Sequence, residues 1–109
     1  MSLEQHKAGT LRYCPPELVA GEYFKADPSF DVWSMGVLMY RMLYGEFPFT
    51  GSDWSTTKKA IIKGRLKFPK TVEVSKTCKT FIKVFLNKDH NKRPKLYQIA
   101  KHPWFNTKK

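Results

Sequence analysis

The sequence predicts an all-α fold, and three observations support this prediction. Apolar residues recur at helical spacing in several segments of the 109-residue chain. Polar capping residues precede these segments, and glycine or proline follows them. Alternation of apolar and polar residues is nearly absent, so Leu66, Lys67 and Phe68 form the one weak candidate for a strand.

The most apolar segment, DVWSMGVLMYRMLY at residues 31–44, predicts a helix that other parts of a protein enclose on every side. Only Ser34 and Arg41 interrupt its apolar surface, whereas a surface helix carries a single apolar stripe. Asp31 is expected in the first turn, where a carboxylate suits a helix cap and the helix dipole. Gly45 is expected to end the helix.

Three shorter helices are expected after this segment. Ser52 or Asp53 can cap a helix at about 53–63, which is expected at the surface because its apolar residues are few. Another helix is expected to begin near Ser75, and a last one covers about 95–101. The helix after Ser75 is amphipathic, with the apolar positions Cys78, Phe81, Ile82, Phe85 and Leu86.

These helices are too few to enclose the segment 31–44. Leaving three or four large apolar side chains exposed to water forgoes about 1.5–3 kcal/mol for each of them. That loss is large beside the stability of about 5–15 kcal/mol that is typical of a domain. Part of the hydrophobic core is therefore expected to lie outside this sequence.

The net charge of +11 is unevenly distributed along the chain. Residues 1–56 hold four basic and seven acidic side chains, whereas residues 57–109 hold sixteen basic and two acidic ones. Lys76, Lys79 and Lys83 recur at helical spacing opposite the apolar positions, which favours an ordinary solvated helix face over a nucleic-acid interface. No DNA- or RNA-reading motif is recognised, and no apolar run is long enough to span a membrane.

The two cysteines, Cys14 and Cys78, lie far apart and lack the spacing of a metal site. They predict reduced thiols and an intracellular protein, either cytoplasmic or nuclear.

Five short motifs, in order and with matching spacing, resemble those of eukaryotic Ser/Thr protein kinases. GTLRYCPPE at residues 9–17 resembles the G-T-x-x-Y-x-A-P-E segment that closes the activation loop, although Pro15 replaces the usual Ala. The other four are DVWSMGV at 31–37, GEFPF at 45–49, NKRP at 91–94 and HPWF at 102–105. The pattern is similar to kinases of the calmodulin-dependent type or their Pim-like relatives.

This resemblance implies the C-terminal part of a kinase C-lobe, helices F to I, without the N-lobe and the catalytic loop. It divides the chain into a tail or expression remnant at 1–8, a partial C-lobe at 9–105 and a basic tail at 106–109.

The resemblance also implies roles for individual residues. The loop that faces the residue after the phosphoacceptor would comprise Gly9, Thr10, Leu11, Arg12 and Tyr13. In the family Thr10 would lie against the catalytic Asp, and a threonine there favours Ser/Thr substrates.

Further residues would hold this loop on its helical base. Glu17 is expected to form a buried ion pair with Arg93. Asp31 and Trp33 are expected to anchor the F helix, with Asp31 accepting hydrogen bonds from the catalytic-loop backbone; the alternative is that Asp31 simply caps the helix.

The sequence contains none of the G-x-G-x-x-G, V-A-I-K, H-R-D-x-x-x-x-N and D-F-G motifs that bind nucleotide and metal in kinases. The chain alone is therefore expected to be inactive and to bind no cofactor, while ATP and Mg²⁺ would serve the longer kinase. Its expected partners are a protein or peptide substrate and the missing kinase half. The alternative is a pseudokinase-like docking module that self-associates, or engages another kinase, through its exposed apolar helix.

Overall fold

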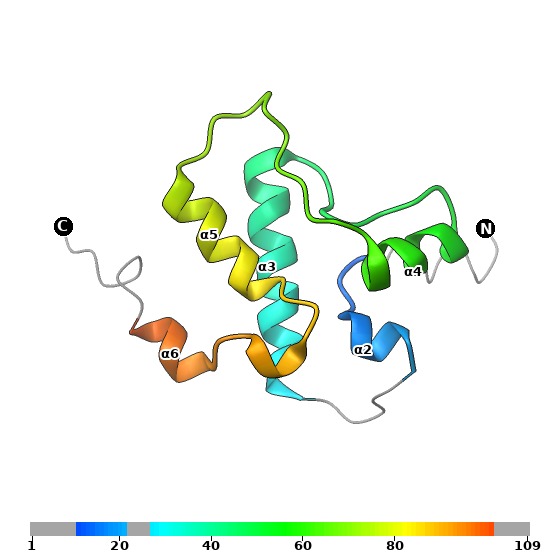
Figure 1. The fold of residues 1–109 in the computed structure, drawn as a ribbon, viewed down its shortest axis with the longest axis horizontal. Helices are drawn as coiled ribbons and strands as arrows, with labels where there is room; N and C mark the ends of the chain where they lie inside the picture. The colour runs from blue at the N-terminus through cyan, green and yellow to red at the C-terminus, as the bar shows by residue number, and fades with distance from the viewer. Residues whose placement is uncertain (1–10, 22–26, 102–109) are drawn as a thin grey trace.

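The computed structural model describes residues 11–21 and 27–101, and every regular element among them is helical (Figure 1). The all-α prediction is confirmed, and the segment 66–68 is not a strand. The elements are α2 (Pro16–Val19), α3 (Pro28–Tyr44), α4 (Trp54–Lys63), α5 (Lys76–Phe85), the 3₁₀ turn η1 (His90–Lys92) and α6 (Leu96–Ala100). None of the described helices combines the length and the apolar character needed to cross a membrane.

The central helix α3 begins earlier than the sequence pattern predicted. Its N-cap is Asp27, whose carboxylate accepts a hydrogen bond from the Ser29 amide at 2.9 Å, and Pro28 occupies the first helical position. This hydrogen bond from the Ser29 amide lowers the pKa of Asp27. The alternative that Asp31 caps the helix is therefore wrong, although Asp31 lies in the first turn as predicted. Gly45 ends α3 in the left-handed conformation, with φ at 75°.

Helix α5 packs closely against α3 at Gly36. A Cβ atom at this glycine would lie 2.8 Å from both the Phe85 Cβ and the Leu86 Cδ2, so a larger residue would force the helices apart. The core around this contact includes Trp33, Val37, Tyr40, Ile82 and Leu86, all of which are buried.

Helices α2 and α4 lie on the other side of α3 from α5 and α6 (Figure 1). Asp53 caps α4 in a capping box: its carboxylate accepts from the Thr56 amide, and the Thr56 hydroxyl accepts from the Asp53 amide. Although α4 has few apolar residues, it places Ile61 and Thr57 in the core, and both are fully buried.

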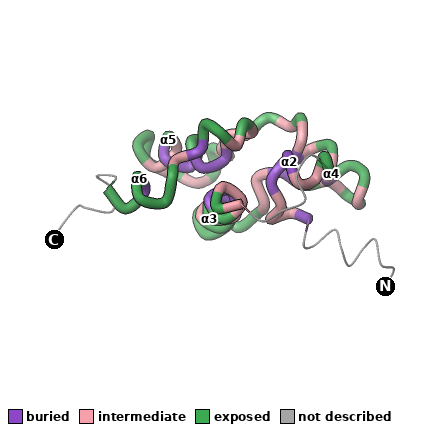
Figure 2. The backbone as a smooth tube through the Cα atoms, turned by 90° about the horizontal axis from the view of Figure 1, so that it is seen from below, coloured by how far each residue is buried: buried purple, intermediate pink, exposed green. Residues whose placement is uncertain are grey.

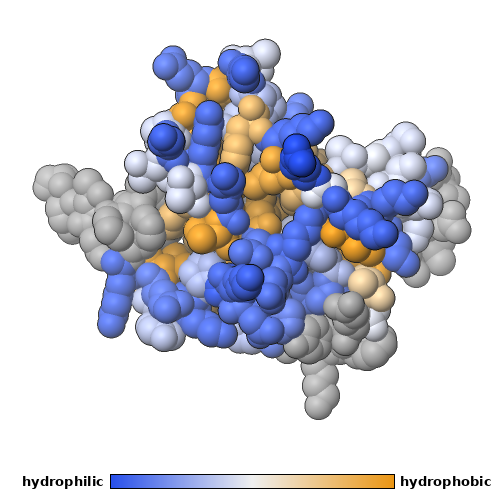
Figure 3. Space-filling model, viewed as in Figure 1, coloured by the Kyte–Doolittle hydropathy of each residue, from blue (hydrophilic) through white to orange (hydrophobic). Residues whose placement is uncertain are grey.

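Helix α5 has the two faces that its sequence predicted. Ser75 caps it, and its apolar residues Phe81, Ile82 and Phe85 are buried. Lys76 and Lys83 are exposed, and hydrophilic side chains cover much of the face shown in Figure 3.

The outer side of α3 has no cover from the described residues. Figure 2 shows the helix nearly end-on, with exposed residues on the side away from α5. The exposed apolar residues there are Met35 at 36%, Leu38 at 50% and Met42 at 77%. The expected enclosure on every side is thus absent from this part of the chain, which agrees with the expectation that the helix needs further partners.

Candidate functional site

The predicted substrate loop continues into α2, and the structure describes its second half. Gly9 and Thr10 lie outside the described residues. Leu11 is buried, while Arg12 and Tyr13 are half-buried. A turn follows, in which the Cys14 amide donates to the Leu11 carbonyl at 2.9 Å. Arg12 and Tyr13 are therefore partly exposed, and they lie between the buried Leu11 and the turn at Cys14.

Tyr13 is attached to α3 at two points. Its carbonyl accepts a hydrogen bond from the Ser34 hydroxyl at 3.0 Å, and its own hydroxyl accepts from Arg41 Nη1 at 2.8 Å. Ser34 and Arg41 are the two polar interruptions in the apolar helix, seven positions apart and therefore on one face. No role was predicted for these two residues from the sequence, although their shared spacing was the available signal.

Two guanidinium groups lie beside the ring of Phe47. The Arg41 guanidinium carbon is 4.3 Å from the ring centroid and that of Arg12 is 5.2 Å away. Arg12 Nε also donates to Thr50 Oγ1 at 3.0 Å, and the Tyr13 ring meets Phe47 edge-on at 5.3 Å. The loop consequently presents positive charge at its exposed edge.

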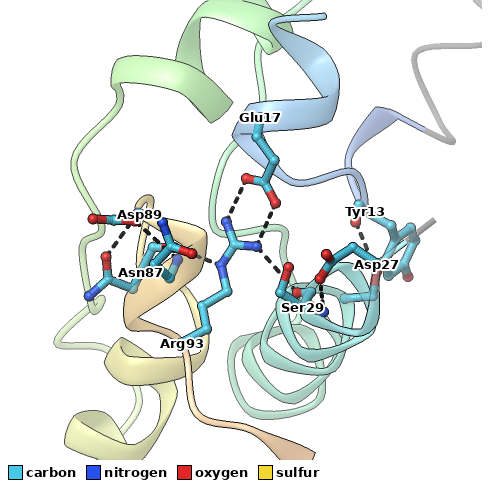
Figure 4. A network of polar contacts seen from close by, with 9 residues as sticks. Tyr13, Glu17, Asp27, Ser29, Asn87, Asp89 and Arg93 are labelled. Carbon is cyan, nitrogen blue, oxygen red and sulfur yellow. Dashed lines mark hydrogen bonds and ion pairs between the residues drawn. The ribbon is translucent and has the colours of Figure 1, made fainter. Parts of the chain in front are cut away.

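A buried ion pair fixes α2 to the C-terminal part of the chain (Figure 4). Arg93 Nη1 and Nη2 donate to the two carboxylate oxygens of Glu17 at 2.7 and 2.8 Å. The same guanidinium donates from Nη1 to the Ser29 carbonyl at 3.2 Å and from Nε to the Asn87 carbonyl at 2.8 Å. Its carbon lies 5.0 Å from the Trp33 ring centroid. Glu17 and Arg93 are both almost fully buried, so their charges are satisfied within the protein.

Local turns bring Arg93 into this position. The Asn87 side chain accepts from the Asp89 amide, and the Asp89 carboxylate accepts from the Asn91 amide, which caps η1. The chain thereby reverses after α5 and returns Arg93 towards α2 and α3. Asp89 has a structural role here.

Trp33 and Asp31, which were predicted together as helix anchors, have different surroundings. Trp33 is fully buried and stacks on Phe49, with the ring centroids 5.7 Å apart. Asp31 is exposed and lies on the same uncovered face as Met35 and Leu38. Of the two residues, only Trp33 belongs to the core around Arg93.

Lys88 is a further structural cation that sequence reasoning missed. Its Nζ donates to the carbonyls of Ala60 and Ile61 in the last turn of α4 and lies 3.6 Å from the centroid of the Phe49 ring. Burial lowers the pKa of Lys88 to about 8. The residue connects α4 to the segment that leads to Arg93.

Comparison with known proteins shows consistent similarity. Residues 2–105 match the family model described as protein kinase domain. The chain is 43% identical over 96 residues to the serine/threonine-protein kinase Aurora-2 of Arabidopsis thaliana, and 39% identical over 99 residues to the serine/threonine-protein kinase ppk16 of Schizosaccharomyces pombe. These alignments cover 88% and 91% of this chain but 33% and 14% of the relatives, so the chain spans a third or less of their length.

Replacing Glu17→Ala is expected to lower the free energy of unfolding by about 3–5 kcal/mol, because it leaves Arg93 buried without a counter-charge. Urea unfolding followed by circular dichroism measures this change. Lys83→Ala, on the exposed face of α5, is the control and should alter stability by less than about 0.5 kcal/mol. Equal stabilities of the two variants would contradict a structural role for the ion pair.

Lys88 should make stability depend on pH in alkaline solution. Its folded-state pKa of about 8 lies below the ordinary lysine value of 10.5, so between these values the unfolded chain binds more protons. Stability therefore rises with pH across this window. Lys88→Met removes the titrating amine, so the stability of the original chain relative to this variant should increase from pH 8 to 10.5. Parallel pH profiles of unfolding for the two proteins would refute the assignment.

Proposed function

Because this chain belongs to the protein kinase family, we propose that it is the peptide-positioning loop and helical base of a Ser/Thr protein kinase. The longer kinase would transfer phosphate from ATP to Ser or Thr side chains of proteins. The observation that carries this proposal is the attachment of Tyr13 to both Ser34 and Arg41, which fixes the loop on α3. A loop held in one orientation can align a substrate hydroxyl for transfer.

The chain alone is proposed to be inactive. Its 109 residues contain none of the four kinase motifs that bind nucleotide and metal. Among the described residues, no cluster of three or more His, Cys, Asp or Glu side chains could hold a metal ion. We therefore assign ATP and Mg²⁺ binding to other parts of the kinase domain.

The positive edge of the loop suggests a substrate preference. Arg12 and Arg41 both lie beside Phe47, and each guanidinium has more N–H donors than the one hydrogen bond it makes to another residue that the structure describes. A carboxylate on the substrate peptide could accept from these groups. We therefore propose that an acidic residue is preferred directly after the phosphoacceptor.

The uncovered face of α3 is proposed to contact the rest of the kinase domain. Asp31, Met35, Leu38 and Met42 follow one another at spacings of four, three and four residues, so they form a single line along the helix. In the longer protein the missing kinase half would cover this line. In the isolated chain, a second copy can cover it instead.

An intracellular location, cytoplasmic or nuclear, is part of the proposal. The proposal is supported by the sequence positions of Cys14 and Cys78, which lie far apart and suit reduced thiols.

A chimera tests the proposed function directly. Residues 9–105 would replace the matching segment of the Arabidopsis kinase Aurora-2, and the chimera should phosphorylate Ser/Thr peptides in an ATP-dependent assay.

Arg12→Glu in this chimera should lower kcat/KM about tenfold for a peptide with Asp after the phosphoacceptor, because it reverses the charge at the loop edge. The decrease should be smaller for a peptide with Lys at that position.

The matched control is Arg65→Glu, which reverses an exposed charge in the segment after α4 and should leave the preference unchanged. A chimera that folds and binds ATP but transfers no phosphate would overturn the proposed function. An Arg12→Glu chimera with unaltered preference would overturn only the role of Arg12.

Self-association through α3 gives a separate prediction. At about 100 μM, light scattering of the isolated chain should give the mass of a dimer, because apolar faces of this kind associate at such concentrations. Leu38→Lys together with Met42→Lys should restore the monomer, since both residues lie on the uncovered line. Val84→Lys together with Leu96→Lys changes two exposed apolar residues elsewhere and should leave the dimer intact. A monomeric original chain would contradict the prediction.

A further inference from the structure

A groove lies between α5 and the segment that leads to α6, separate from the Leu11–Tyr13 loop. Its volume is about 860 Å³, which is enough for several peptide side chains. The floor is apolar and includes the buried residues Phe81, Phe85 and Ile99. Val84 and Tyr97 also line it, and they are 41% and 65% exposed. The groove therefore presents apolar surface that solvent can reach.

The rim of this groove is basic. Lys76 at the start of α5, Lys92 in η1 and Lys95 before α6 all line it. None of its described lining residues is acidic. Figure 3 shows hydrophobic surface enclosed by hydrophilic side chains on the face that carries α5 and α6.

The acidic residues of this half of the chain do not neutralise the rim. Residues 57–109 contain two, Glu73 and Asp89, and neither lines the groove. The Asp89 carboxylate is occupied as the cap of η1. A ligand that complements the groove must therefore bring both negative charge and apolar side chains.

We propose that this groove binds an acidic amphipathic segment of a partner protein. Leu or Phe side chains of the segment would lie on the floor, next to Val84 and Phe85. Asp or Glu side chains on either side of them would pair with Lys92 and Lys95. A nucleic acid would match the lysines only, because it has no aliphatic side chain to place on the floor.

The site is distinct from the substrate loop in both position and chemistry. Figure 1 shows α5 and α6 on one side of α3 and α2 on the other, so the groove and the loop are separated by the central helix. A partner bound in the groove would leave the Leu11–Tyr13 loop accessible. The proposal therefore goes beyond phosphate transfer and concerns the recruitment of a second protein.

Fluorescence anisotropy with defined peptides tests the proposal on the full chain. The probe is a fluorescein-labelled peptide of about twelve residues, in which Glu residues flank a central Leu and Phe, and the comparison peptide has Lys in place of Glu. The Glu peptide should bind at least about tenfold more tightly than the Lys peptide. Lys92→Glu together with Lys95→Glu should weaken binding of the Glu peptide about tenfold. The control is Lys59→Glu together with Lys70→Glu, at exposed positions outside the groove. This control should change the affinity less than about twofold.

A separate variant tests whether the apolar floor of the groove contributes to peptide binding. Val84→Glu should also weaken binding of the Glu peptide about tenfold. Leu43→Glu is its matched control, because Leu43 is similarly exposed and lies outside both the groove and the Asp31–Met42 line. Thermal unfolding of each variant checks that the fold is retained. Unchanged affinity in the variant carrying Lys92→Glu and Lys95→Glu, or in Val84→Glu, would overturn the proposal. The proposal would also be overturned if a thymidine oligomer displaced the peptide and bound the Val84→Glu variant with the same affinity as the original chain. That result would assign the lysines of the rim to nucleic-acid binding.

Discussion

The guanidinium of Arg93 is the group on which the arrangement of the described chain depends. It meets Glu17, which is 76 residues away in sequence, and it also binds the carbonyls of Ser29 and Asn87. Removing a charged pair from water costs several kcal/mol, and the cost is recovered only where the geometry satisfies the remaining donors. Here the two terminal nitrogens and Nε all have acceptors. The start of α3, the turn before η1 and α2 must therefore all be in place at once.

Helix α3 extends this constraint to the Leu11–Tyr13 loop. Its first turn supplies the Ser29 carbonyl to Arg93, and Ser34 and Arg41 further along bind Tyr13. Because a helix keeps these positions at fixed separations, the loop and the ion pair behave as parts of one body. A protein that must orient a flexible peptide benefits from this rigidity, since a loop held at several points presents its side chains in one geometry.

The sequence predicted the helices better than the contacts between them. The bounds of α4 and the start of α5 were within about one residue because Asp53 and Ser75 are local capping signals. The start of α3 was missed because the cap at Asp27 lies before the apolar pattern begins, and α2 and η1 are too short to show a periodicity. The binding of Tyr13 by Ser34 and Arg41 depends on tertiary folding, which no local pattern encodes.

The basic residues in the second half of the chain fall into two groups, one buried or half-buried and one exposed. Arg93 is buried and paired, and the pKa of Lys88 is lowered by burial at the end of α4, so both cations serve the fold. Lys76, Lys92 and Lys95 are exposed around an apolar groove and have no acidic neighbour lining it. A charge that stabilised the fold would be expected to have a partner within the protein. Lys95 has such a partner, because it attracts the Asp27 carboxylate at the start of α3. The proposed acidic partner accounts for the remaining concentration of lysines beside exposed apolar side chains.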